Sequence, residues 1–374
     1  MRYRRMPIEV ESPEQLGYDT ITNNLSESSV ADRRLSDLGL ELELDDLLLC
    51  YGDHLGDAAL REVIASGGDG LRPDDVLVTP GAAAALFCTA TSLLDPGDHV
   101  VVVRTNYATN LETPRAIGAE VDVVDLAFDH GWQLDVGQLA ARVRRGTTRL
   151  ISVTCPHNPT GTMLDVESLH ALVDLAERSG AVLLVDETYR DLTHAEPRRL
   201  PMAADLSTRA VSVSSMSKAY GLPGLRVGWA VCRDPGLAET LLAAKEQVVI
   251  CGPTLDEAIA ARVLAARPQI LPAILDGVRA HLAIVRDWLA AQDTFEWVEP
   301  TGGVVGLVRV RPEIEIDTAC FYRTLLAEHG TYVGRGHWFE LDDRHFRLGF
   351  GWPTTAELSA GLVALSRSAA AACA

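Results

Sequence analysis

The chain has 374 residues, of which 47% are hydrophobic and 23% charged, a composition typical of a globular protein large enough for two domains. With 33 basic and 52 acidic residues its net charge is −19, which argues against nucleic acid or an anionic membrane as a partner. The basic first residues are not followed by an apolar segment, so we expect no signal peptide and a cytoplasmic location. Seven scattered cysteines without a C-x-x-C pair favour reduced thiols and no metal site.

The first 45 residues are polar and acidic, and we assign them to an N-terminal arm that contributes to a small domain. Residues 38–49 fit either a short helix or an alternating strand, and the pattern leaves both open. Further along, apolar runs alternate with amphipathic stretches. We expect helices over residues 57–65, 81–94, 135–142 and 166–179, and strands over residues 75–79, 99–103, 121–126, 150–154, 181–185, 210–214 and 226–232.

This alternation predicts an α/β fold with three layers, in which helices cover both faces of a mostly parallel sheet. Residues 235–292 are expected to be helical, with interruptions near Gly252-Pro253 and Arg267-Pro268. The remainder predicts a smaller α+β domain, with strands at 304–310 and near Tyr332 and Phe346, and helices at 317–328 and 355–372. We therefore place a large domain at 46–290 and a small domain at 291–374, and the arm at 1–45 forms part of the small domain.

The stretch over residues 212–229, SVSSMSKAYGLPGLRVGW, contains one of only two lysines in the chain, Lys218. An amine can lose its proton and form a Schiff base with a carbonyl, whereas a guanidinium cannot. Ser215 and Ser217 add hydroxyls, and Arg226 adds a fork that matches phosphate. A nucleophilic lysine among phosphate-binding groups suggests pyridoxal phosphate. The alternative is an ordinary lysine on a solvated turn.

The pattern S-x-S-K-x-x-G-x-x-G-x-R-x-G in this stretch resembles the lysine motif of the class I/II aminotransferases, which are fold-type I pyridoxal phosphate enzymes. Further motifs similar to those of the family extend the resemblance from about Asn24 to Phe350. The resemblance implies that the large domain binds pyridoxal phosphate as an aldimine on Lys218. It also implies that the enzyme acts at Cα of an amino acid.

The resemblance places the phosphate cup at the start of the helix over residues 81–94, at Gly81, Ala82 and Ala83, where free N–H groups and the helix dipole favour an anion. The family often has a hydroxyl there and this chain has none, so we expect Ser215 and Arg226 to contribute more.

Tyr107, in T-N-Y-A-T-N, matches the first aromatic of the family's P-x-Y-x-x-Y, which stacks on the pyridine ring. The chain departs from that motif at Thr105 and Asn110, and a half-buried loop tyrosine is the alternative. Asn158 lies in N-P-T-G, which closely matches the family, and would donate to the phenolic oxygen of the cofactor and lie beside the substrate.

Asp186 follows an apolar strand, and the resemblance makes it the catalytic carboxylate that keeps the pyridine nitrogen protonated. A helix cap is the alternative. Tyr189 would share the phenolic oxygen with Asn158 and assist catalysis. Arg347, in F-R-L-G-F, matches the arginine that grips the α-carboxylate of the substrate through two parallel bonds.

Tyr51, in Y-G-D-H-L-G, is similar to the tyrosine with which relatives reach the neighbouring subunit's phosphate, so the resemblance implies a homodimer with shared active sites. His54 in the same motif is either a substrate contact or an inert loop histidine.

The strongest departure from the family is the acidic, hydroxyl-rich segment N-L-S-E-S-S at residues 24–29, where relatives have an apolar, glycine-containing segment over the substrate. Glu27 in this segment would select a cationic or strongly hydrogen-donating side chain. The alternatives are a solvated arm or an ion pair with Arg33.

The expected activity is transamination of an amino acid to a 2-oxo acid, with Lys218 as the general base at Cα. The alternative is a specialised biosynthetic enzyme of the same cofactor that carries out elimination, cyclisation or oxidation, with cationic amino acids among its candidate substrates. A regulator or binding module without chemistry is disfavoured because every central residue is present.

Overall fold

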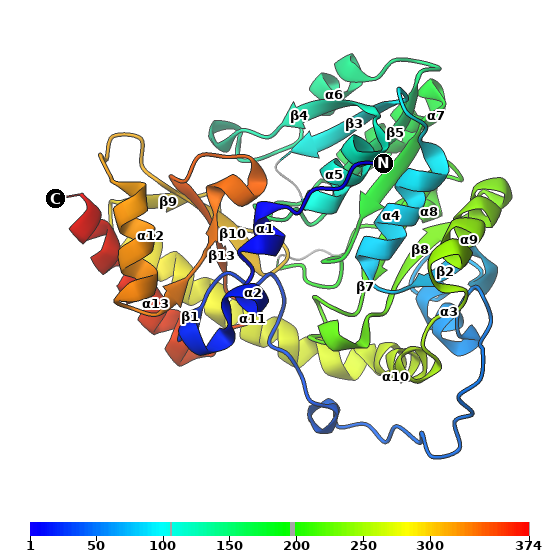
Figure 1. Cartoon of the computed structure of the whole chain (residues 1–374), viewed down its shortest axis with the longest axis horizontal. Coiled ribbons are helices and arrows are strands. Elements are labelled where there is room, and N and C mark those ends of the chain that lie inside the picture. Colours follow the sequence, from blue (N-terminus) through cyan, green and yellow to red (C-terminus); the bar gives the residue numbers. More distant parts are fainter. Residues whose placement is uncertain (105–106, 195–198, 374) are drawn as a thin grey trace.

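The structure, a computed structural model, describes residues 1–104, 107–194 and 199–373 and contains a large and a small sheet (Figure 1). The large sheet has seven strands in the order β2-β8-β7-β6-β5-β3-β4. Their bounds are β2 Val76–Thr79, β3 His99–Arg104, β4 Glu120–Asp125, β5 Thr148–Thr154, β6 Val182–Asp186, β7 Ala210–Ser215 and β8 Gly228–Cys232. Strand β8 runs antiparallel to both neighbours, and the other pairs are parallel.

Helices cover both faces of this sheet, because its strands are apolar on both sides. Val100 and Val102 of β3 pack with α4 (Ala82–Leu93), α5 (Ala108–Ile117) and α9 (Pro235–Val249). Val101 and Val103 point the other way and pack with α6 (Val136–Arg142), α7 (Val166–Ser179) and α8 (Ala203–Leu206). The predicted three layers are therefore confirmed.

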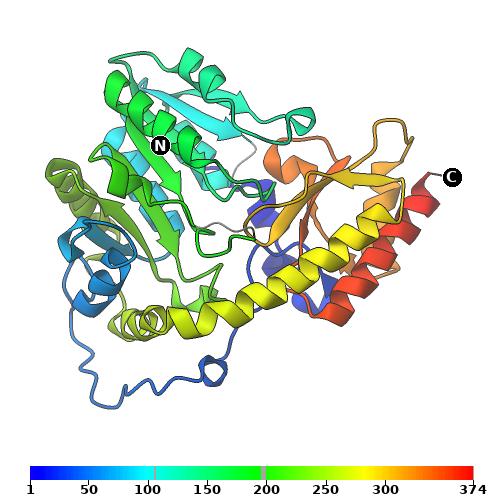
Figure 2. The ribbon, with the colours of Figure 1, turned by 180° about the vertical axis from the view of Figure 1, so that it is seen from behind.

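The small sheet is antiparallel and has the order β12-β13-β10-β9. Its strands are β9 Phe295–Trp297, β10 Val305–Val310, β12 Gly334–Arg335 and β13 His345–Gly349. Helices α12 (Thr318–Ala327) and α13 (Thr355–Ala372) accompany it, and the long α11 (Arg267–Ala290) runs beside α13 (Figure 2). Near the N-terminus, β1 (Asn23–Asn24) pairs with β11 (Thr331–Tyr332), so both ends of the chain meet here.

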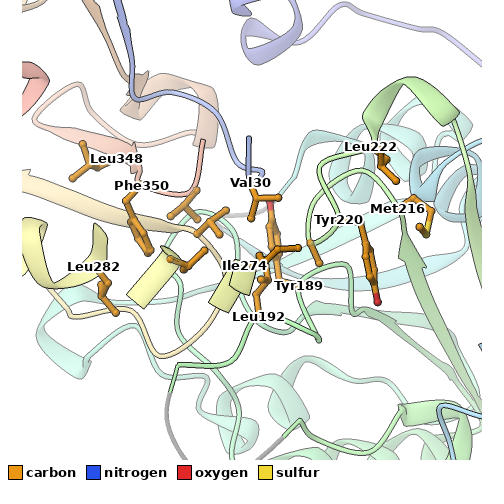
Figure 3. Close-up of a cluster of buried hydrophobic side chains, with 14 of the residues drawn as sticks. Val30, Tyr189, Leu192, Met216, Tyr220, Leu222, Ile274, Leu282, Leu348 and Phe350 are labelled. Atoms are coloured by element: carbon orange, nitrogen blue, oxygen red, sulfur yellow. The ribbon is translucent and has the colours of Figure 1, made fainter. Parts of the chain in front are cut away.

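One buried cluster joins the two sheets. It takes Val30 from the N-terminal arm, Tyr189 from the loop after β6, Ile274 from α11 and Phe350 from the end of β13 (Figure 3). Because the same core holds both sheets, side chains projecting from either one are fixed relative to the other.

Most predicted elements agree with the structure to within one or two residues, including α3 (Ala58–Ala65) and the breaks before α10 (Thr254–Ala265) and α11. Residues 38–49 form neither of the two alternatives: beyond the end of a short 3₁₀ turn at Leu35–Leu38 they cross the surface without regular structure. No pattern in the sequence predicted α1 (Pro7–Val10), α2 (Pro13–Leu16) or α5. Among the described residues, no single helix has the length and apolar character to cross a bilayer, and only α10 and α11 taken together, across a 77° bend, meet those criteria.

Candidate active site

A cavity of about 390 Å³ lies at the carboxyl ends of β5, β6 and β7, where ligands bind in open parallel sheets. Its wall contains nearly all of the predicted site residues, namely Glu27, Ala82, Ala83, Tyr107, Asn158, Asp186, Tyr189, Ser215, Ser217, Lys218, Arg226 and Arg347. Gly81 lies directly behind the wall, and Tyr51 lies elsewhere.

Lys218 projects from the turn after β7 into this cavity, so the alternative of a solvated turn is wrong. Its Nζ donates to Ser28 Oγ at 3.1 Å. Burial lowers the pKa of Lys218, and the negative charge of Glu27 opposes this shift in part. A lysine in this setting releases its proton more readily than one on the surface.

A cradle for an anion forms where α4 begins, beside the Arg226 turn. A side chain at Gly81 would bring its Cβ to 2.6 Å from an Arg226 guanidinium nitrogen, and one at Gly228 to 2.5 Å from the Ala82 nitrogen. Among the described residues, no side chain caps the start of α4, so its first N–H groups face the cradle together with Ser215. Glycine is required at both positions for this close approach.

Asp186 is buried at the end of β6, and its Oδ1 accepts from the backbone N–H of Thr188 at 3.1 Å and from the Thr188 hydroxyl at 2.6 Å. Burial raises the pKa of Asp186, while the hydrogen bonds from Thr188 lower it. No helix follows Asp186, since residues 188–190 form a turn, so the helix-cap alternative is wrong. The supporting role of Thr188 was missed, although its place two residues after the aspartate is typical of such turns.

Tyr107 and Tyr189 face the same cavity. The Tyr107 hydroxyl donates to Glu9 Oε1 at 3.3 Å, and burial raises the pKa of Tyr107 to about 12. The Tyr189 hydroxyl donates to the Ser28 carbonyl at 2.7 Å. A joint role of Tyr189 and Asn158 toward one ligand oxygen stays a prediction, and Thr105 lies outside the described residues.

Arg347 is buried in the middle of β13 and lines the same cavity as Lys218. One guanidinium nitrogen donates to Asn158 Oδ1 at 3.1 Å and the other to the Ser26 carbonyl at 2.6 Å. The third nitrogen, Nε, has no partner among the described residues, although it is buried. A buried N–H without an acceptor is rare in folded proteins, and the Nε atoms of Arg311 and Arg335 share this state.

Glu27 lines the cavity within a segment that is otherwise buried, so the alternative of a solvated arm is wrong. Its Oε1 accepts from Asn24 Nδ2 at 3.4 Å. Burial raises the pKa of Glu27, whereas the charges of Lys218 and Arg347 lower it. Among the described residues it forms no ion pair with Arg33.

Several wall residues were not predicted, and most of them come from the N-terminal arm: Ile8, Glu9, Ser12, Pro13, Glu14, Ser26 and Ser28, together with Thr154, Thr188 and Trp338. The arm has no hydrophobic periodicity from which its position in the fold could be predicted. The only available signal was its excess of carboxylates and hydroxyls.

Tyr51 and His54 lie outside the cavity on the surface segment that follows residue 39. Tyr51 is 84% exposed, and His54 Nδ1 lies 2.6 Å from Glu246 Oε1. Beneath them the second lysine, Lys245, is completely buried, and its Nζ donates to the His54 carbonyl. Within one chain, neither Tyr51 nor His54 can touch a ligand in the cavity.

The chain matches the sequence profile of aminotransferase class I and II over residues 34–365. It is 35% identical over 328 residues to a capreomycidine synthase of Streptomyces vinaceus (87% of this chain, 82% of that protein). It is 31% identical over 313 residues to the arginine–pyruvate transaminase AruH of Pseudomonas aeruginosa (80% and 77%).

Solved structures agree with these matches. A pyridoxal phosphate-dependent aminotransferase from Streptococcus suis superimposes with a TM-score of 0.90 at 28% identity, over 98% of both chains. The pyridoxal phosphate-dependent cyclase OrfR superimposes with a TM-score of 0.89 at 29% identity, over 99% of this chain and 98% of that one.

Proposed function

Because the chain belongs to the class I and II aminotransferases, we propose that it acts on an α-amino acid whose side chain carries a guanidinium or ammonium group. Like its relatives, it is a pyridoxal phosphate-dependent enzyme that acts on amino acids. Family membership alone does not identify the side chain of the substrate. That part of the proposal rests on the charges of the cavity.

The cavity fits pyridoxal phosphate. The glycine-dependent cradle of Arg226, Ser215 and the α4 N-terminus would hold the phosphate, with Ser217 beside it. Asp186 would pair with the ring nitrogen, and Tyr107 would cover the ring. When bound, the cofactor supplies an electron sink that stabilises negative charge at the substrate Cα.

Residues of the chain would bind the substrate and transfer the proton at Cα. Arg347 would bind the α-carboxylate through its guanidinium, which Asn158 would hold in the right plane. Lys218 would carry the cofactor and, once free, take the proton from Cα. Its lowered pKa increases the share of neutral amine that can do so.

The observation that carries the proposal is the excess of carboxylates on the cavity wall. Among the described residues, the wall contains Glu9, Glu14, Glu27 and Asp186 but only three cations, Lys218, Arg226 and Arg347. The cofactor and the α-carboxylate account for Asp186 and for all three cations. Three glutamates remain, of which Glu9 and Glu14 are exposed and Glu27 is partly buried. A partly buried carboxylate such as that of Glu27 is costly unless a cation pairs with it. A cationic substrate side chain would meet this need, and a relative is named an arginine transaminase.

Transamination is the expected outcome of proton removal at Cα. Cyclisation of the same class of substrate is the second candidate, because one relative is named a synthase and one structural neighbour a cyclase. Cyclisation onto Cβ requires a group that leaves from that carbon, so β-hydroxyarginine incubated with the holoenzyme and pyruvate distinguishes the two outcomes by mass spectrometry. Transamination forms the 2-oxo acid and one alanine per turnover, whereas cyclisation releases one water from the substrate and leaves pyruvate unchanged.

The test of the substrate class compares kcat/KM for arginine with that for citrulline, its neutral isostere. We expect the wild type to prefer arginine and Glu27→Gln to lose most of that preference, by about 2–5 kcal/mol. Glu62→Gln, on the exposed face of α3, is the matched control and should change nothing. Equal ratios in the wild type and Glu27→Gln would reject a selecting role for Glu27.

We also propose that two chains associate around the surface segment that carries Tyr51. Large apolar side chains are exposed on this segment and on the adjoining ends of α9 and α10, namely Leu48, Leu49, Tyr51, Val248, Ile250 and Leu255. The Thr254 hydroxyl donates to the Cys50 carbonyl at 2.9 Å and holds the segment against α10. Burying this patch against a second copy would bring Tyr51 toward the partner's phosphate cradle.

Mixing Tyr51→Phe and Lys218→Ala chains tests this association. If the sites are shared, heterodimers contain one complete site and recover activity that neither parent has. A monomer that is fully active at low concentration would contradict the proposal.

A further inference from the structure

Residues 7–16, which we call the strap, include α1 and α2 and lie across the mouth of the cavity, between the small sheet and α5 (Figure 1). On one side, Ile8 is buried against Trp338 and Phe339. On the other side, Glu9 accepts from the Tyr107 hydroxyl. The strap therefore contacts the 3₁₀ turn between β12 and β13 as well as the start of α5, and it forms part of the cavity wall.

Glu11 fixes the strap to β11 and to the 3₁₀ turn at Gly336–Phe339. Its carboxylate accepts from the Trp338 indole nitrogen at 2.7 Å and lies 3.0 Å from His337 Nε2, while its carbonyl accepts from the Tyr332 hydroxyl at 2.8 Å. His337 is itself oriented by Asp343, whose Oδ1 lies 2.8 Å from Nδ1. The Glu11 side chain does not line the cavity, but the residues that follow it, Ser12 to Glu14, do.

Glu14 is exposed to solvent and lines the same cavity as Glu27. Its charge raises the pKa of Glu27, and both carboxylates act on Lys218 and on Tyr18. Two like charges that share one space are unfavourable unless a cation lies between them. Arg347, which we propose binds the α-carboxylate of the substrate, lines the same cavity.

We propose that Glu14 determines specificity by binding, together with Glu27, the distal cation of the substrate side chain, and that Glu11 is the positioning residue that holds Glu14 there. This inference rests on the proposed substrate class. It adds that the strap, rather than the segment at residues 24–29 alone, recognises the end of the side chain.

Equilibrium binding tests the inference without turnover. The probe is 5-guanidinopentanoic acid, which is arginine without its α-amino group and therefore cannot react. Its neutral counterpart is 5-ureidopentanoic acid. Binding of each to the holoenzyme is measured by titration calorimetry in the wild type, Glu14→Gln, Glu11→Ala, Glu11→Gln and the control Glu62→Gln.

We expect Glu14→Gln to weaken binding of the guanidino acid by about 10-fold or more and to leave the ureido acid within about twofold. Glu11→Ala should reduce the same ratio although Glu11 does not touch the ligand. Glu11→Gln keeps an acceptor for Trp338, so its ratio should fall between those of the wild type and Glu11→Ala. In both Glu11 variants, trypsin should cleave more rapidly after Arg4 and Arg5, because the strap is released.

Several results would overturn the inference. Loss of affinity for both ligands to the same extent in Glu14→Gln would indicate a structural role only, and an unchanged affinity for each ligand would indicate no role. A normal ratio in Glu11→Ala despite faster cleavage would reject positioning. If Glu27→Gln abolishes the preference for the guanidino acid while Glu14→Gln does not, the proposed function stands and this inference fails. If the wild type shows no preference, the proposed function itself fails.

Discussion

The cavity has two halves that are built in different ways. The cofactor half, Ala82, Asp186, Ser215, Lys218 and Arg226, comes from strand ends and turns of the seven-stranded sheet, where glycines let backbone segments approach closely. The substrate half is assembled from the two ends of the chain, which are more than 300 residues apart.

In the substrate half, Arg347 donates to Ser26, and Trp338 donates to Glu11. The cofactor half is thus determined by local backbone geometry and the substrate half by side chains of distant segments. A fold built in this way can change its substrate without disturbing its chemistry.

The largest expected effect is in the cofactor half. Lys218→Arg keeps the positive charge but cannot form an imine or act as a base, so turnover should fall by more than about 10⁴-fold. Borohydride treatment of the wild type should attach the cofactor covalently to Lys218. Recovery of the label on Lys245, or on no peptide, would contradict the assignment.

Asp186→Asn should lower kcat by about 10²- to 10³-fold, because an amide cannot stabilise a protonated ring nitrogen. KM for the amino acid should change little, since Asp186 belongs to the cofactor half. A large rise in KM with an unchanged kcat would contradict the assignment of Asp186 to the cofactor half. Steady-state kinetics at saturating cofactor measures both constants.

Substitutions in the substrate half should change KM more than kcat. Arg347→Lys keeps a charge but loses the paired hydrogen bonds to the α-carboxylate, at a cost of about 1.5–3 kcal/mol in kcat/KM, mostly through KM. The absorbance of the bound cofactor should stay that of the wild type. A changed cofactor spectrum would show that Arg347 acts in both halves.

The smallest effect is expected at the contact between the halves. Tyr189→Phe removes the hydrogen bond to the Ser28 carbonyl and should lower the free energy of unfolding by about 1 kcal/mol, measured by urea denaturation at saturating cofactor. An unchanged stability would indicate that this bond does not hold the N-terminal segment in place.

The difference between the halves also explains what could be predicted from the sequence. The cofactor half was predicted residue by residue because its motifs are short and continuous, such as the residues around Lys218 and Asn158. Glu27 was recognised only as a departure from the family. The strap was missed because its position depends on Trp338 and Tyr332, which no local pattern links to it.

Two parts of the fold could not be predicted from the sequence for similar reasons. The leucines of residues 38–49 alternate like a strand, but no neighbouring strand is available to pair with them among the described residues. Helix α5 contains Pro114 and has a low apolar content, so neither period nor composition indicated it.

The burial of Lys245 has a practical consequence for labelling the protein. Arginine supplies all but two of the 33 basic side chains, and of those two, Lys245 is completely enclosed and Lys218 faces the cavity. The outer surface therefore offers no lysine to an amine-directed reagent, and apart from the amino terminus such a reagent can reach a primary amine only through the cavity mouth. Acylation counted by intact mass would thus report directly on whether the cavity is open, filled or covered.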